Sequence, residues 1–372
     1  MKPRILLIYT GGTIGMMKDP ETWVLKTFNF KELLLHIPEL RQLDCEISTI
    51  SYADPIDSSN MNLENWKQLG NMIHERYDDF DGFVVLHGSD TMAYTGSALS
   101  FMFENLTKPI ILTGSQLPIG DLRTDAKENL ITSIQLAAQM QDEQPIIKEV
   151  CIYFEYQLYR ANRTAKVSAD HFEAFTSPNY PPLAISGVYL NIDHNLLWQG
   201  AFDEFAFAKA NQPQAVQQES NNPTGSSSAT SGIQNRMFYR PELINDVVIL
   251  KLFPGITEAV VNAICNIPEL KGIVLETYGS GNAPNEKWFV DAMRQTLDRG
   301  VYIVNVTQCR GGAVDMGKYE TSVQLKEIGM VSGKDMTTES ALAKMMYLLK
   351  YTTSLMDFKH YFEKSLRGEV TE

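Results

Sequence analysis

Short runs of apolar residues alternate with amphipathic stretches through the first half of the chain. Five runs have the length and composition of β-strands: residues 5–9, 46–52, 82–87, 109–113 and 150–154. Stretches with apolar residues at helical spacing lie between them, at 30–37, 63–77, 92–104 and 126–140. A strand followed by turn residues and then a helix is typical of βαβ units. This half is therefore predicted to form a parallel sheet flanked by helices.

The same alternation resumes near the end of the chain. Strands are predicted at 247–252, 272–277 and 301–306, and helices at 258–266, 285–299, 340–350 and 355–366. The segment 211–235 is polar, has Glu219 as its only charged residue and cannot bury enough apolar surface to order itself. The prediction is a two-domain α/β protein, with a larger N-terminal domain (1–205), a flexible polar connector or insertion (206–240) and a smaller C-terminal α/β domain (241–372).

The amino-acid composition limits the kinds of molecule that the protein is expected to bind. The formal net charge is −13 and no Lys/Arg run is present, which argues against nucleic acid because phosphate binding needs a basic face. The apolar run at 5–9 is too short for a signal-peptide core or a membrane helix, and no later stretch is long enough to span a bilayer. No membrane association is expected.

The cysteines and histidines bear on compartment and metal content. The four cysteines lie far apart without CxxC spacing, which is typical of free thiols in a reducing cytoplasm: Cys45, Cys151, Cys265 and Cys309. The six histidines show no paired metal-ligand spacing. A cytoplasmic location is expected, and neither a metal nor another cofactor is expected.

Polar residues directly after predicted strands are the candidates for chemistry, because ligands of parallel sheets bind at the carboxyl ends of the strands. The first strand ends in TGGTIG, where two glycines allow a tight turn and Thr13 offers a hydroxyl that could act as a nucleophile. The spacing is not the GxGxxG of a dinucleotide-binding turn. An ordinary strand-to-loop turn explains this motif equally well.

The third strand ends in HGSDT, which places Ser89 beside Asp90 just before a helix. Asp90 or Thr91 could be a helix N-cap, but capping accounts for only one of these polar residues. His87 could serve as a catalytic base, although a histidine packed at the strand end is the favoured interpretation.

Two further positions have both a functional and an ordinary interpretation. Lys166 taken alone is a solvated surface charge, and it could act as a base only if burial lowered its pKa. Ser58 and Ser59 precede a predicted helix, a location that suits a carboxylate ligand, although a capping turn is the simpler explanation.

Together, TGGTIG and HGSDT at this separation resemble the motifs of the bacterial-type L-asparaginase family, and more narrowly its cytoplasmic type I branch. The resemblance covers nearly the whole chain and includes DSS (57–59), TGSQLP (113–118), RTAK (163–166), YGSGNAP (278–284) and TQC (307–309). It implies a flavodoxin-like N-terminal domain and intimate homodimers, commonly paired into tetramers, with active sites at the dimer interface.

The resemblance also implies roles for individual residues. Thr13 would attack the side-chain amide of asparagine, and a second triad of Ser89, Asp90 and Lys166 would move protons. The DSS turn, with Ser58 and Ser59, would bind the substrate together with Ser89 and Asp90. Asn282 would reach in from the neighbouring subunit. These roles are chemically reasonable, because a threonine hydroxyl needs a nearby base and a zwitterionic substrate needs both an acceptor and donors.

Four positions depart from the family pattern. Ser89 replaces the usual threonine and keeps the hydroxyl, but its rotamer is less restrained. Trp23 stands where many members carry a lid tyrosine, and Tyr319 is expected to supply that hydroxyl instead. Glu276 and Ala165 replace the arginine and threonine with which some type I members bind activating asparagine, so activation is expected to be weak or absent.

Three alternatives to an asparaginase remain open. The same chemistry could act on glutamine or another side-chain amide, because one methylene changes binding by only about 1–3 kcal/mol. A tRNA-amidation subunit normally carries an extra N-terminal domain, and the start of this chain at the first strand disfavours that role. A non-catalytic amino-acid sensor would need no nucleophile, so retention of Thr13, Asp90 and Lys166 argues against it.

Overall fold

The computed structural model describes residues 2–18, 25–27, 37–199, 237–317 and 320–372. Several sequence predictions fall outside these ranges: the helix at 30–37 apart from its last residue, the polar segment 211–235, Trp23 and Tyr319.

The N-terminal domain is built on an eight-stranded sheet whose order is β15-β14-β11-β10-β7-β5-β1-β4. The predicted parallel strands are all present: β1 (Arg4–Gly11), β4 (Glu46–Ile56), β5 (Gly82–Leu86), β7 (Ile110–Thr113) and β10 (Val150–Phe154). Counted along the chain, their spatial order is 2-1-3-4-5, which is the flavodoxin-like order and confirms the predicted fold class.

Three antiparallel strands extend this sheet beyond β10 and were not predicted. They are β11 (Gln157–Arg160), β14 (Ala184–Ser186) and β15 (Leu190–Ile192). The turn from β10 into β11 uses Glu155 and Tyr156, both with positive φ, which permits the tight reversal.

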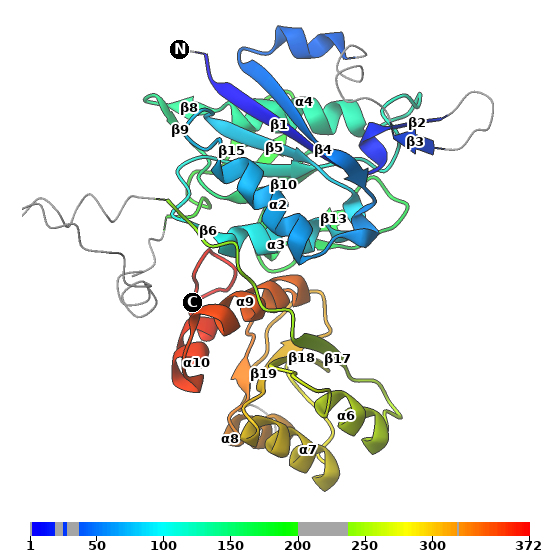
Figure 1. Ribbon diagram of the computed structural model, residues 1–372, viewed down its shortest axis with the longest axis vertical. Helices are drawn as coiled ribbons and strands as arrows, with labels where there is room; N and C mark the ends of the chain where they lie inside the picture. Colours follow the sequence, from blue (N-terminus) through cyan, green and yellow to red (C-terminus); the bar gives the residue numbers. More distant parts are fainter. Residues whose placement is uncertain (1, 19–24, 28–36, 200–236, 318–319) are drawn as a thin grey trace, which may run out of the picture.

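Helices cover both faces of the sheet, as the alternation along β1 requires (Figure 1). Leu6 and Ile8 point to the face covered by α2 (Leu63–His74) and α3 (Met92–Met102). Ile5 and Leu7 point to the opposite face, which α4 (Ala126–Ala137) covers. Both faces are therefore apolar, as expected for a central parallel strand.

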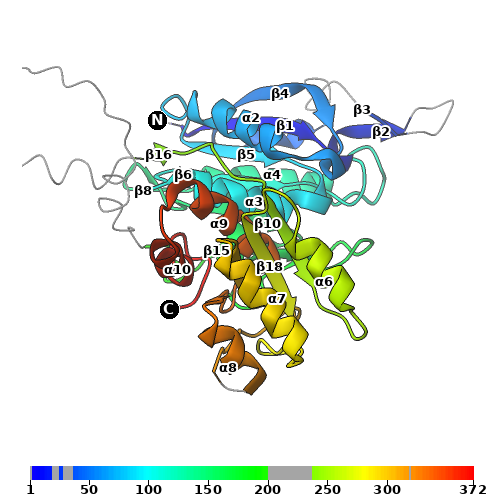
Figure 2. The same ribbon diagram turned by 60° about the horizontal axis from the view of Figure 1, so that its bottom comes forward.

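The C-terminal domain has a four-stranded parallel sheet, β17-β18-β19-β20, formed by Val247–Lys251, Gly272–Thr277, Tyr302–Thr307 and Val331–Ser332. One face packs on α6 (Glu258–Cys265), α7 (Lys287–Asp298) and α8 (Glu320–Glu327). The other packs on α9 (Thr338–Tyr351) and α10 (Leu355–Glu363). Figure 2 shows the same domain from below.

The two domains join through α3 and α9, which lie side by side between the two sheets (Figure 1). Every residue of α3 except Tyr94 is buried, because the large sheet covers one side of the helix and α9 another. The prediction of a helix within 92–104 is therefore confirmed, but the prediction that it is amphipathic is wrong. Its second partner lies more than two hundred residues away in sequence.

Short strand pairs complete the described structure: β2 (Met16–Lys18) with β3 (Leu25–Thr27), β6 (Phe103–Glu104) with β16 (Phe238–Tyr239), β8 (Met140–Gln141) with β9 (Gln144–Pro145), and β12 (Ala165–Lys166) with β13 (Phe175–Thr176). The β6–β16 pair attaches the end of the expected connector to the N-terminal domain. Within the described ranges, no helix is long and apolar enough to cross a membrane.

Candidate active site

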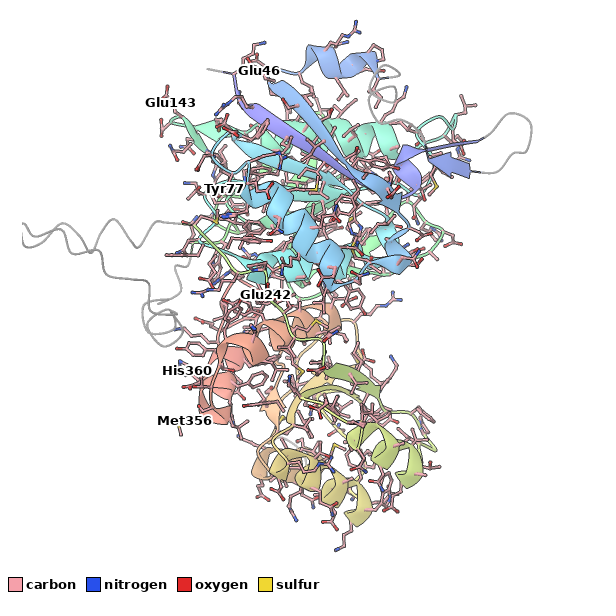
Figure 3. All side chains as sticks on the ribbon, viewed as in Figure 1. Glu46, Tyr77, Glu143, Glu242, Met356 and His360 are labelled. Atoms are coloured by element: carbon pink, nitrogen blue, oxygen red, sulfur yellow. The ribbon has the colours of Figure 1, made fainter. Side chains whose placement is uncertain are left out.

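The carboxyl ends of β1, β4 and β5 meet in tight backbone contact, on the side of the domain away from Glu46 at the amino end of β4 (Figure 3). Gly11 and Gly12 have φ values of +136° and +92°, and both positions exclude a side chain. A Cβ on Gly11 would lie 2.0 Å from the Ile56 carbonyl oxygen, and one on Gly12 would lie 2.6 Å from Gly88 Cα. These contacts bring the turn that carries Thr13 against the turn that carries Ser89.

Thr13 begins the 3₁₀ turn η1 (Thr13–Gly15), directly after Gly12, and is half-buried. Ser89 and Asp90 lie on η4 (Ser89–Thr91), directly after Gly88. Because the backbones of Gly12 and Gly88 are in contact, Thr13 and Ser89, the residues that directly follow these two glycines, start from neighbouring points.

The two serines of the DSS turn point in different directions. Ser58 is buried, and a Cβ on Gly88 would lie 2.5 Å from its Oγ. The hydroxyl of Thr91 donates to the Ser58 carbonyl at 2.8 Å, which ties the two turns together. Ser59 is exposed, and its hydroxyl and N–H both donate to Asp57 at 2.9 Å, which lowers the pKa of that carboxyl. Ser58 is thus the serine that faces the HGSDT turn.

Lys166 reaches this cluster from a different part of the sequence. It lies on β12, and only 17% of its side chain is exposed. Its Nζ donates to Ser89 Oγ at 2.8 Å and to Asp90 Oδ1 at 2.6 Å. The interpretation of Lys166 as a solvated surface charge is therefore wrong, since the β12–β13 pair directs the side chain onto the end of β5.

Gln116 also belongs to the cluster and was not singled out by sequence reasoning. Its Oε1 accepts from Ser89 Oγ at 3.4 Å, and its Nε2 donates to the His171 carbonyl at 2.9 Å. Its backbone N–H donates to the Asp125 carboxylate at 2.9 Å. The available signal was the TGSQLP sequence directly after β7, the strand next to β5 in the sheet.

His87 is a buried orienting residue rather than a solvent-facing base. Its Nδ1 donates to the Gly88 carbonyl at 2.7 Å, because that oxygen can only accept. Nε2 then accepts from the Thr95 hydroxyl at 2.9 Å, and Thr95 Oγ1 accepts from Trp66 Nε1 at 2.9 Å. Burial lowers the pKa of His87 to about 4, so the ring is neutral near pH 7. This chain of bonds fixes the turn immediately before Ser89.

The other sequence-predicted positions lie elsewhere. Asn282 is on the C-terminal domain, in a loop closed by two backbone hydrogen bonds of 2.8 and 2.9 Å with Tyr278. Glu276, on β18, accepts from Thr338 Oγ1 at 2.6 Å and pairs with Lys251 Nζ at 3.0 Å. Tyr319 lies outside the described residues.

The assembled groups are hydroxyls, one carboxylate and one enclosed lysine at a strand edge. A hydroxyl nucleophile with a lysine–hydroxyl pair in reach is suited to acyl transfer. Over the ranges that the structure describes, no group of three or more His, Cys, Asp or Glu side chains is arranged to hold a metal ion.

Comparison with known proteins gives matches along almost the whole chain. The family model "Asparaginase, N-terminal" matches residues 4–198, and "Glutaminase/Asparaginase C-terminal domain" matches residues 246–362. The chain is 38% identical to L-asparaginase 1 of Escherichia coli, over 100% of this chain and 98% of that protein. It is 37% identical to the human 60 kDa lysophospholipase, over 99% of this chain and 61% of that protein.

A solved structure agrees with the sequence matches. The crystal structure of L-asparaginase I from Vibrio cholerae superimposes with a TM-score of 0.82 at 35% identity, and the match covers 100% of both chains.

Proposed function

The chain belongs to the asparaginase family, and on that premise we propose that it hydrolyses the side-chain amide of L-asparagine to L-aspartate and ammonia, with Thr13 as nucleophile. The observation that carries the proposal is the pair of bonds from Lys166 to Ser89 and Asp90, at 2.8 and 2.6 Å. These bonds join two segments that are 76 and 77 residues apart in sequence, beside the turn that carries Thr13.

In the first half-reaction, Thr13 Oγ attacks the amide carbon and loses its proton towards the lysine–serine pair. Lys166 is assigned as the base, and the Ser89 hydroxyl can pass the proton because it can donate and accept at once. The negative oxygen of the tetrahedral intermediate would be stabilised by backbone N–H groups at the strand ends. Collapse breaks the C–N bond, ammonia leaves with a proton, and an aspartyl ester of Thr13 remains.

In the second half-reaction, water attacks the ester carbon and gives its proton to the same base. The C–O bond to Thr13 breaks, aspartate leaves and the threonine hydroxyl is regenerated. One lysine therefore serves both steps, and the proton balance closes over the cycle.

Substrate recognition is assigned to the groups around this relay. Asp90 keeps 67% of its side chain exposed despite its bond to Lys166, so it can accept from the α-ammonium of asparagine. Ser58, Ser59 and the N–H groups of their turn would serve the α-carboxylate. Asn282 would complete the site from a second subunit of a homodimer or of a dimer-of-dimers tetramer. Tyr319 is proposed as the lid tyrosine.

A cytoplasmic location is part of the same proposal. All four cysteines in the described structure are free thiols, as expected in a reducing compartment.

The experiment that tests this function is ammonia release from asparagine and, in parallel, from glutamine. We expect wild type to turn over asparagine, and Thr13→Ala to lose turnover while still binding aspartate by calorimetry. Turnover of glutamine in place of asparagine would reassign the substrate. Amino-acid binding without ammonia release from either amide would identify a sensor and refute the enzyme assignment.

A further inference from the structure

Lys166 has little local structure to hold it. It lies on the two-residue strand β12, which pairs only with the two-residue strand β13, in a sheet separate from the large one. A catalytic group has to be placed to within a fraction of an ångström, and such a short strand pair does not restrain a backbone that well on its own. Additional restraint therefore has to come from the residues that flank Lys166.

Arg163, three residues before Lys166, is bound on all three of its guanidinium nitrogens. Nε donates to the Gly368 carbonyl at 2.7 Å, Nη1 to Asp335 Oδ2 at 2.8 Å and Nη2 to Thr371 Oγ1 at 3.0 Å. Only 2% of the Arg163 side chain is exposed. All three acceptors come from the C-terminal part of the chain, so the other domain restrains this arginine.

The acceptors are themselves restrained. Asp335 accepts from the Thr371 N–H at 2.9 Å and from its hydroxyl at 2.5 Å. Burial opposes ionisation of Asp335, but the bonds from Thr371 and Arg163 outweigh it and lower the pKa of this carboxyl. Asp335 and Arg163 therefore form a carboxylate–guanidinium ion pair at neutral pH.

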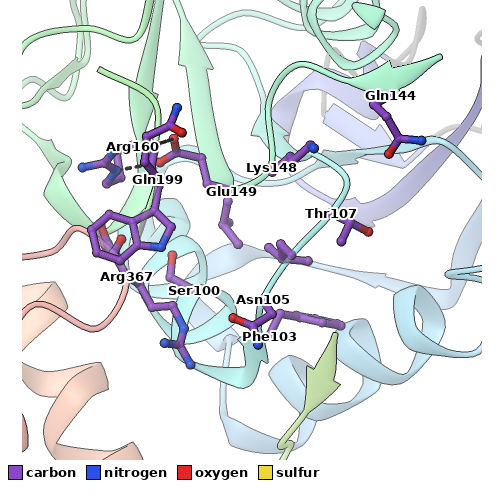
Figure 4. Close-up of a pocket in the computed structure, with 14 residues that line it drawn as sticks. Ser100, Phe103, Asn105, Thr107, Gln144, Lys148, Glu149, Arg160, Gln199 and Arg367 are labelled. Atoms are coloured by element: carbon purple, nitrogen blue, oxygen red, sulfur yellow. Dashed lines mark hydrogen bonds and ion pairs between the residues drawn. The ribbon is translucent and has the colours of Figure 1, made fainter. Parts of the chain in front are cut away.

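The segment 365–371 is held by a second buried ion pair. Glu369 is fully buried and accepts from Lys344 Nζ and from the N–H groups of Leu366 and Arg367. Gly368 has φ +76°, and a Cβ there would lie 2.4 Å from the Arg160 guanidinium, so any larger residue is strained and has to displace that group. Arg160 and Arg367 line one side of a cavity of about 440 Å³, with Lys148 and Thr107 across from them (Figure 4).

We propose that Arg163 is a positioning residue for Lys166. Arg163 is itself held in place by three residues of the C-terminal domain, Asp335, Gly368 and Thr371. A buried ion pair contributes little net stability compared with apolar residues of the same size, because desolvation offsets the attraction. A fully bonded pair three residues from Lys166 is better explained by orientation. The proposal rests on the proposed function at one point, which is the role of Lys166 in the reaction.

The test uses Thr371→Val, which removes one hydroxyl at nearly constant volume, and Thr371→Ser, which restores it. Arg163→Lys is the stronger variant. Thr296→Val is the matched control, because it makes the same substitution at a buried threonine whose hydroxyl bonds within α7, to the Ala292 carbonyl at 2.7 Å. For each variant, kcat, KM and Tm are measured on the folded fraction, together with the rate at which acetic anhydride acetylates Lys166, read by peptide mass spectrometry.

We expect Thr371→Val to lower kcat roughly tenfold with little change in KM, since a displaced base affects the chemical step more than binding. Acetylation of Lys166 should become faster, Thr371→Ser should behave as wild type, and Thr296→Val should lower Tm alone. Unchanged kcat and unchanged acetylation in both Thr371→Val and Arg163→Lys, with only Tm lowered, would overturn the proposal.

The acetylation readout separates this proposal from the function itself. If wild type releases ammonia from no amide but Thr371→Val still speeds acetylation of Lys166, the proposed function fails and the positioning role stands. If wild type is active and acetylation is unaffected in every variant, the positioning role fails and the function stands.

Discussion

Lys166 and Asp90 form an ion pair of 2.6 Å in which the two partners differ sharply in exposure: 17% of the lysine side chain is accessible against 67% of the aspartate side chain. The lysine is thus enclosed against Ser89, whereas the carboxylate keeps a free edge towards solvent. This asymmetry suits a site in which the lysine handles protons and the carboxylate meets the charged end of a small ligand.

Lys166→Met tests the assignment of proton transfer to the lysine. Methionine has a similar length and no titratable group, so the base is removed while the packing is largely kept. We expect kcat for ammonia release to fall about 10²- to 10⁴-fold, the usual contribution of general acid–base catalysis. Lys166→Arg is the control, because it keeps the positive charge beside Asp90 but cannot act as a base at neutral pH. Equal activity in wild type and Lys166→Met would contradict the assignment.

Most of the parallel core was predictable because β1, β5, β7 and β10 are almost entirely buried and read as apolar runs. The edge strand β4 is mostly exposed or half-buried, yet its sequence was also recognisable as a strand. The antiparallel extension was not, because β14 and β15 are three residues long and partly exposed, with too few positions to show a period. The burial of α3 was also beyond the reach of a local pattern, since α9 supplies its second partner from the far end of the chain.

The residues of the candidate site likewise include some that the sequence pattern could identify and some that it could not. Thr13 and Ser89 follow directly on strands, where parallel-sheet geometry directs attention. Lys166 has no such marker, and its local sequence is that of a surface lysine; only the family resemblance placed it in the site. Gln116 was missed although it follows β7, because an amide side chain carries no distinctive chemistry outside its contacts with Ser89 and His171.

A pH-dependent stability is expected from Glu155. Burial, followed by the charges of Asp125, Glu128 and Glu173, raises the pKa of Glu155 from 4.5 to about 7. Between these values the folded protein binds more protons at this position than the unfolded chain, so the contribution of Glu155 to stability falls as pH rises. Glu155→Gln removes the titration, and we expect it to raise Tm relative to wild type at about pH 8 but not at about pH 4.

Glu143→Gln is the control for that experiment. Glu143 also has a positive φ, 61° against 43° at Glu155, but it is exposed. Any cost of glutamine in the left-handed conformation is therefore matched between the two variants. Thermal unfolding at both pH values checks the result, and a Tm difference for Glu155→Gln that is the same at both would count against the raised pKa.

The dependence of rate on asparagine concentration is expected to be hyperbolic. Some type I members place an arginine where this chain has Glu276, and both Glu276 oxygens here are already engaged, by Thr338 at 2.6 Å and Lys251 at 3.0 Å. A carboxylate at this position repels the carboxylate of an activating asparagine, so binding at a second site lacks its cation. Steady-state rates over a wide range of asparagine concentrations measure this, and a sigmoidal curve would disprove it.

Two glycines test the contact between the Thr13 turn and the Ser89 turn. At Gly12, φ +92° combines with ψ 170°, a conformation that is essentially restricted to glycine, so an alanine there is strained before any contact is counted. Gly300 also has a positive φ, +84°, so the two positions share that feature. They differ in surroundings: a Cβ on Gly12 would lie 2.6 Å from Gly88 Cα and 3.0 Å from the His87 carbonyl carbon, whereas one on Gly300 would meet nothing within 4 Å.

Gly12→Ala must therefore push the Thr13 turn away from the Ser89 turn, and Gly300→Ala need not move either. We expect Gly300→Ala to lower Tm by roughly 2–4 °C and to keep the wild-type kcat. Gly12→Ala is expected to lose on the order of 10²-fold in kcat, because displacement by about 1 Å is enough to misalign a nucleophile. Loss of kcat in the folded fraction of Gly12→Ala, with wild-type kcat in Gly300→Ala, would assign the contact between Gly12 and Gly88 to catalysis. Equal kcat in both variants would show that the site tolerates separation of the two turns, and Thr13 would then no longer be the preferred nucleophile.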